Sequence, residues 1–195
     1  MADGIILTGG MSERFGSPKA FAVWKEGYFY ERAIQALHSE VKTIWLISHP
    51  SFAGRIKAGE QVNIKEDLPP HKEKGPLAGL FTGLSYTKEE WVFMLPVDMP
   101  LITAEEVRFL ASYITADTDA VVPEIGGRLA PACGWFRADL LSKAEAQLEA
   151  GDYRMKNVFS GNERVVDVNQ AYWHPEAFEN INTAQQLEEL NRKVK

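Results

Sequence analysis

The chain has little cysteine, no long apolar run and no excess of positive charge. Its one cysteine, Cys133, excludes an intrachain disulfide and any cysteine cluster for zinc or an iron–sulfur centre. It lies in the apolar segment Leu129–Phe136, which is typical of a buried, inert thiol. No stretch approaches the length of a membrane span, and the first residues lack the cationic region of a signal peptide. We therefore expect a cytoplasmic protein without a membrane partner.

The charge balance and the histidines exclude further classes of protein. With 27 acidic and 21 basic residues the net charge is -6, whereas a general nucleic-acid binder is usually basic. The four histidines show neither H-x-H nor H-E-x-x-H spacing, and no G-x-S-x-G elbow is present. We therefore predict no histidine metal site, no Ser/His/Asp triad and no nucleic-acid partner. A small phosphorylated substrate stays open, because a few local cations and backbone N–H groups suffice to bind it.

What the chain does contain is a regular alternation of short apolar runs and amphipathic segments. Its 195 residues, 45% of them hydrophobic, predict one domain over residues 1–195. The predicted strands are Gly4–Leu7, Thr43–Ile47, Gln61–Ile64, Trp91–Leu95 and Asp119–Val122. The predicted helices are Tyr28–His38, Pro76–Tyr86, Thr103–Ile114, Ala138–Ala150 and Thr183–Lys195. Apolar strands separated by helices indicate a three-layer α/β/α, Rossmann-like fold with a mostly parallel sheet.

The pattern changes after residue 122. Gly126 and Gly127 predict a tight turn, so that Leu129–Phe136 returns as an antiparallel strand. The segment Val165–Tyr172 is also predicted to be a strand. Thr103 and Glu106 have the spacing of a capping box at the start of their helix.

A glycine-rich loop from Leu7 to Lys19 follows the first predicted strand. Gly9 and Gly10 allow the main chain to approach a ligand, and successive N–H groups there can bind anionic oxygens. Arg14 and Lys19 add two cations suited to phosphate. The spacing is neither a Walker loop nor a dinucleotide fingerprint. The alternative is a glycine turn with two surface cations, but strand, glycine pair, Arg and Lys together favour a nucleoside triphosphate site.

Two aspartates follow other predicted strands, at the edge where ligands bind in such sheets. Asp98 follows Trp91–Leu95 and is suited to hold Mg²⁺, unless it is a turn residue before Pro100. Asp67 follows Gln61–Ile64 and could accept hydrogen bonds from a guanine edge or a ribose hydroxyl, unless it is a solvated turn residue. Gly75 and Gly79 flank the start of a helix, where they serve either nucleoside approach or helix packing.

Four segments carry a resemblance to a known family. The loop LTGGMSERFGSPK resembles the signature of the molybdenum cofactor guanylyltransferases, the MobA family of nucleotidyltransferases with the glycosyltransferase-A-like fold. GPLAGL at 75–80, LPVDMPLI at 95–102 and NINTAQQL at 180–187 resemble three further family segments. The resemblance therefore spans nearly the whole chain in order.

The resemblance implies a reaction, its ligands and its residues. The enzyme would transfer GMP from GTP to the phosphate of molybdopterin, which can already carry molybdenum, and release pyrophosphate, with Mg²⁺ as cofactor. Transient contact with cofactor carriers or molybdoenzyme maturation proteins is also implied. The catalytic residues would be Arg14, Lys19 and Asp98, with Asp98 as the metal ligand. The nucleotide-binding residues would be Leu7, Thr8, Gly9, Gly10, Lys19, Ser48, Asp67, Gly75, Gly79 and Asp98.

The acceptor residues and the choice of base leave alternatives. Arg154, Asn180 and Asn182 would bind the acceptor; Arg154 can instead be a surface residue, and an Asn can cap the last helix. Ser48 replaces a family Asn that touches the nucleotide, and Thr8 replaces an Ala. A cytidylyltransferase for molybdopterin or an enzyme for a sugar or alditol phosphate is the nearest alternative. A non-catalytic nucleotide-binding maturation partner is another.

Overall fold

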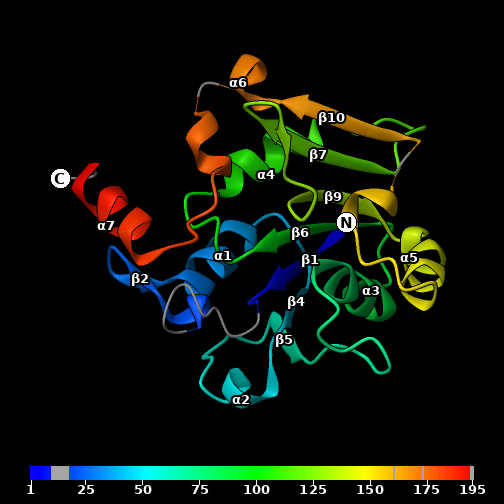
Figure 1. Ribbon diagram of the computed structural model, residues 1–195, viewed down its shortest axis with the longest axis horizontal. Helices are drawn as coiled ribbons and strands as arrows, with labels where there is room; N and C mark the ends of the chain where they lie inside the picture. Colours follow the sequence, from blue (N-terminus) through cyan, green and yellow to red (C-terminus); the bar gives the residue numbers. More distant parts are fainter. Residues whose placement is uncertain (10–17, 160, 173, 194–195) are drawn as a thin grey trace.

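The core of the fold is a sheet that runs through the whole molecule. The computed structural model describes residues 1–9, 18–159, 161–172 and 174–193. In these ranges the sheet has eight strands in the order β10-β7-β9-β6-β1-β4-β5, with β8 paired to β7 (Figure 1). The strands are β1 Ala2–Leu7, β4 Ile44–Ile47, β5 Val62–Lys65, β6 Trp91–Pro96, β7 Ala120–Ile125, β8 Arg128–Leu129, β9 Gly134–Arg137 and β10 Glu163–Asp167. All neighbouring pairs are parallel except those of β8 and β9, which confirms the predicted mostly parallel sheet.

Helices cover both faces of the sheet. The larger ones are α1 Phe29–Leu37, α3 Pro76–Tyr86, α4 Ala104–Ala111, α5 Leu140–Glu149 and α7 Ala184–Lys193. Consecutive strand residues enter different cores: Ile6 packs with α1 and α4, whereas Ile5 packs with α3 and α5. Because side chains alternate along a strand, an apolar pair such as Ile5 and Ile6 requires a cover on each face. The predicted three-layer arrangement is therefore confirmed (Figure 1).

Two predicted strands are wrong in part. Leu129–Phe136 is not continuous: Pro131 lacks a backbone N–H, and Gly134 has φ +142, so the chain breaks between β8 and β9. A Cβ at Gly134 would collide with the Val121 carbonyl. In Val165–Tyr172 the strand ends at Asp167, whose side chain accepts the Asn169 N–H and starts the short helix α6 Val168–Ala171. The predicted capping box of Thr103 and Glu106 is confirmed.

Several short elements were not predicted from the sequence pattern. They are the 3-10 helix η1 Lys19–Phe21, the hairpin of β2 Val23–Trp24 and β3 Gly27–Tyr28, and the helix α2 Pro50–Ala53. Two further 3-10 helices are η2 Met155–Asn157 and η3 Pro175–Phe178. Elements of two to four residues are too short to show a hydrophobic period. Among the residues that the structure describes, none of the helices has the length and apolar character that crossing a bilayer requires.

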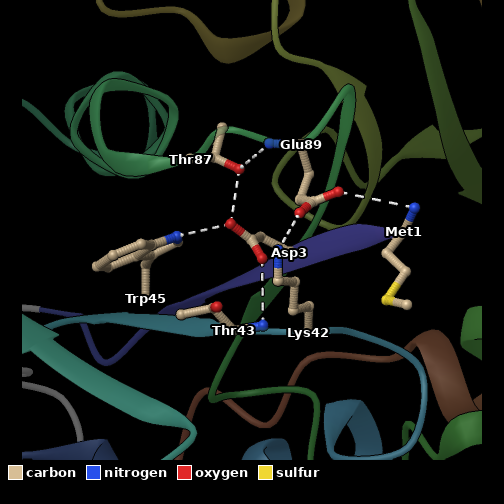
Figure 2. Close-up of polar contacts among 7 residues, drawn as sticks. All are labelled: Met1, Asp3, Lys42, Thr43, Trp45, Thr87 and Glu89. Carbon is tan, nitrogen blue, oxygen red and sulfur yellow. Dashed lines mark hydrogen bonds and ion pairs between the residues drawn. The ribbon is translucent and has the colours of Figure 1, made fainter.

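A buried carboxylate joins three segments at the amino end of the sheet. Asp3, 3% exposed, accepts the Thr43 N–H at 3.1 Å, the Trp45 indole N–H at 3.1 Å and the Thr87 hydroxyl at 2.7 Å (Figure 2). Above it, Glu89 lies between the amino terminus and Lys42. Asp3 therefore ties β1 to β4 and to the end of α3, at the edge opposite the strand ends described below.

An Asp3→Ala variant is expected to lose about 3 kcal/mol of unfolding free energy, because three partly buried donors would lose their acceptor. Urea unfolding measures the loss. Glu89→Ala is the control, and its midpoint should move far less, because its partners are 82% and 60% exposed. Equal midpoints for Asp3→Ala and the unsubstituted protein would contradict the assignment.

Candidate active site

The carboxyl ends of four parallel strands meet at one edge of the sheet. The register pairs Leu7 with Ile47 and with Pro96, and Ile47 with Lys65. The residues that follow these ends therefore emerge together around a cleft of about 600 Å³. The predicted site residues that line it are Leu7, Thr8, Gly9, Lys19, Ser48, Asp67, Gly75, Gly79 and Asp98. The predicted residues Gly10 and Arg14 lie outside the described part of the chain.

The start of the glycine-rich loop is shaped by its backbone. Gly9 has φ +72, and a Cβ there would meet nothing within 4 Å. The left-handed conformation, rather than lack of space, is therefore what requires glycine. The Thr8 hydroxyl is buried and donates to the Ile47 carbonyl at 3.0 Å. The Thr8 N–H donates to the same carbonyl at 3.1 Å, so both donors of Thr8 hold β1 to β4 and neither is available to a ligand.

A lysine and an aspartate form an ion pair in the cleft. Lys19 Nζ lies 3.0 Å from Asp98 Oδ2 and 2.8 Å from Asn182 Oδ1. The pair is largely shielded, with side chains 15% and 20% exposed. The backbone of Asp98 is held in place as well, since its carbonyl accepts the Ile181 N–H at 2.7 Å. Segments distant in sequence thus meet at one carboxylate.

One oxygen of that carboxylate is available to a metal ion. In the part of the chain that the structure describes, Asp98 Oδ1 is buried and has no hydrogen-bond partner. Across the described ranges, no group of three or more His, Cys, Asp or Glu side chains could hold a metal ion. These residues fit Mg²⁺, which commonly binds one or two carboxylates and completes its shell with water and substrate phosphate. They do not fit a metal ion that needs an all-protein cage.

A second carboxylate in the cleft, Asp67, is only half paired. Its Oδ2 accepts the Glu73 N–H at 3.1 Å, while Oδ1 is buried and has no partner among the described residues. Burial raises the pKa of the Asp67 carboxyl above its ordinary value, because loss of water disfavours the charge, and the Glu73 N–H opposes this. An unpaired buried acceptor of this kind is suited to a ligand N–H or O–H.

Glycine is required at two positions near the start of α3, for a different structural reason at each. Gly75 has φ +75 and open space at its Cβ position, so its backbone conformation requires glycine. A Cβ at Gly79 would collide with the Leu7 side chain, so Gly79 lets α3 pack closely on β1. Helix packing, one of the two predicted alternatives, therefore explains Gly79, although it also lines the cleft.

Comparison with known proteins gives the cleft its context. Residues 4–168 match the family model described as "MobA-like NTP transferase domain". The chain belongs to the MobA-like NTP transferase family. It is similar to a "Probable molybdenum cofactor guanylyltransferase" of Geobacillus sp. strain WCH70, with 36% identity over 190 residues and 96% of each chain covered. One of the same name from Bacillus mycoides is 34% identical, with 98% of this chain and 96% of the relative covered.

Solved structures share the fold. Molybdopterin-guanine dinucleotide biosynthesis protein A of Archaeoglobus fulgidus superposes with a TM-score of 0.80 at 17% identity, covering 98% of each chain. A nucleotidyl transferase of Methanothermobacter thermautotrophicus gives a TM-score of 0.74 at 17% identity, covering 99% of this chain and 97% of its own. The chain is therefore a nucleotidyltransferase with the Rossmann-like fold of this family, as the sequence predicts.

The residues predicted to bind the family's acceptor are not brought together in the cleft. Arg154 donates to both oxygens of Asp152, at 2.7 and 2.8 Å, and does not line the cleft. Asn180 is exposed beside the buried Ile181. Asn182 contacts Lys19, so it lies next to the ion pair.

The alternative prediction, that the side chain of one of these asparagines caps α7, is wrong. Thr183 Oγ1 accepts the Gln186 N–H, while Gln186 Oε1 accepts the N–H groups of Asn182 and Thr183. Thr183 is therefore the residue whose side chain caps the helix.

The sequence pattern did not identify four polar residues and one proline that line the cleft. They are His49, Pro50, Glu66, Lys72 and Glu73. His49 and Glu66, which adjoin Ser48 and Asp67, could have been identified because they follow predicted strands. The path of the loop after Asp67 could not, because it depends on tertiary contacts. Cys133 is fully buried, and burial raises the pKa of its thiol well above the ordinary value, which confirms the inert thiol.

Proposed function

We propose that this nucleotidyltransferase transfers GMP from GTP to the terminal phosphate of molybdopterin, forming the guanine dinucleotide and releasing pyrophosphate. The observation that carries the proposal is the Lys19–Asp98 ion pair in the cleft, with one Asp98 oxygen unpaired. Support for the substrates comes from relatives 36% and 34% identical that bear the name of this activity.

The reaction needs alignment and charge neutralisation more than a protein nucleophile. An anionic oxygen of the acceptor phosphate attacks the α-phosphorus of GTP. The bond from that phosphorus to the oxygen bridging the α- and β-phosphates breaks, and the pyrophosphate keeps the electron pair. The attacking oxygen is already an anion, so no proton has to be removed by the enzyme.

The roles follow from charge and position. The Lys19 ammonium would bind triphosphate oxygens at the place where it now contacts Asp98 and Asn182. Asp98 Oδ1 would hold Mg²⁺, which when bound neutralises phosphate charge and aligns the α-phosphate. The backbone N–H of Gly9 would bind a phosphate oxygen. Arg14 remains a sequence prediction, with the role of stabilising the leaving pyrophosphate.

One contact supports the proposed binding site for the acceptor molecule. Asn182 lies next to the ion pair, and we propose that it, Asn180 and Arg154 bind the acceptor. An acceptor that reaches Arg154 has to compete with Asp152, which already binds its guanidinium twice. Transient contact with a cofactor carrier or a molybdoenzyme maturation protein would deliver the acceptor.

The test is a comparison of nucleotides with a competent acceptor. The enzyme is incubated with molybdopterin, Mg²⁺ and GTP, CTP, UTP or ATP in turn, and pyrophosphate and the dinucleotide mass are measured. GTP alone is expected to support rapid turnover. A faster reaction with CTP would contradict the choice of base, and tight GTP binding without any product would contradict catalysis. Omission of Mg²⁺ should abolish product in each reaction.

A further inference from the structure

Ser48 does not make the contact with the nucleotide that the asparagine of the family makes at this position. Its side chain is 4% exposed, and its hydroxyl donates to the adjacent His49 carbonyl at 3.3 Å. Serine is also shorter than the asparagine that it replaces. If the enzyme selects guanine, another side chain in the cleft has to supply the contact that Ser48 does not make.

Glu73 is held in an uncommon backbone conformation at the cleft. Its φ is +62, in the left-handed region that glycine and asparagine favour. In that conformation its N–H donates to Asp67 Oδ2, and both residues line the cleft. Asp67 Oδ1 then stays unpaired. One loop thus presents two carboxylates to the same space.

His49, another residue that lines the cleft, contacts the Glu73 carboxylate. His49 Nδ1 accepts the Ser51 N–H at 3.1 Å, so the ring proton of the neutral imidazole lies on Nε2. Nε2 lies 3.1 Å from Glu73 Oε1 and donates to it. Within the described ranges, no group donates to Glu73 Oε2. The Glu73 carboxylate, 73% exposed, is therefore held by the residue that follows Ser48, with an acceptor oxygen available.

The chemistry of two such carboxylates matches one base edge. Ionised carboxylates only accept hydrogen bonds. Guanine presents two adjacent donors, N1–H and the 2-amino group, whereas adenine, cytosine and uracil each place an acceptor beside their one donor group on the pairing edge. We infer that Glu73 accepts a hydrogen bond from the 2-amino group of guanine while Asp67 accepts N1–H. Glu73 is thus a specificity-determining residue, an inference that rests on the proposed function.

Inosine triphosphate isolates this contact, because it lacks only the 2-amino group of GTP. The variant is Glu73→Gly, since glycine adopts φ +62 without strain and keeps the N–H that binds Asp67. We expect the ratio of kcat/KM for GTP to that for ITP to fall about tenfold, the value of one hydrogen bond to a charged group. The ITP value itself should change less than twofold. Glu73→Asn, which also tolerates this backbone, should give the same loss.

The matched control is Glu66→Gln, because Glu66 is a third carboxylate of the same loop and its charge is paired with Lys72 at 3.0 Å. Its GTP/ITP ratio should stay at that of the unsubstituted enzyme. Equal losses for GTP and ITP in both Glu73 variants would overturn the inference while leaving GTP as the substrate. Preference of the unsubstituted enzyme for CTP would instead overturn the proposed function. Binding of GTP and ITP, followed by thermal shift, gives the same comparison without turnover.

Discussion

Asp98→Asn should lower kcat for nucleotidyl transfer about 10³-fold or more, while the protein keeps its fold. The amide oxygen can still accept from Lys19, so the local packing is retained. The amide nitrogen, however, replaces the unpaired Oδ1, and a donor in that position cannot bind Mg²⁺. Pyrophosphate release from GTP in the presence of molybdopterin measures the effect.

Asp117→Asn is the control for that substitution. Asp117 is exposed in the turn before β7 and does not line the cleft, so its variant should keep full turnover. Circular dichroism and the thermal midpoint show whether Asp98→Asn is folded. Full turnover of a folded Asp98→Asn enzyme would remove Asp98 from the reaction.

Lys19→Met should lower kcat/KM for GTP about 10²-fold, because methionine keeps the apolar stem but removes the charge that neutralises the triphosphate. The affinity for GTP should fall as well, since the same ammonium is used before and during the reaction. Lys19→Arg should restore little of this activity. The Lys19 ammonium lies between two acceptors only 3.0 and 2.8 Å away, and the larger, planar guanidinium does not fit there.

Lys88→Met is the matched control, since Lys88 is exposed after α3 and outside the cleft. Its variant should bind and turn over GTP normally. If Lys19→Met lost turnover but bound GTP as tightly as the unsubstituted enzyme, Lys19 would act on the transition state alone. If neither quantity changed, the assignment of Lys19 to the triphosphate would be wrong.

Much of the fold could be predicted because periodicity is a local property. Gly4–Leu7 and Trp91–Leu95 are continuous apolar runs, and only a sheet covered on both faces buries both sides of such strands. Pro76–Tyr86 was predicted to the residue, since Pro marks its first turn. The breaks at Gly134 and Asp167 were missed, because each depends on a particular φ or side-chain contact rather than on a period.

The glycine-rich loop, Lys19, Asp67 and Asp98 were predictable from sequence because each follows a strand, and parallel strands deliver their carboxyl ends to one edge. Sequence alone thereby indicated the fold class, the family and part of the cleft lining, although it missed His49 and Glu73. Only the tertiary structure decided how they are paired: Lys19 between Asp98 and Asn182, and Glu73 between Asp67 and His49. Such pairings join residues up to 163 positions apart, and no local pattern encodes contacts over that separation.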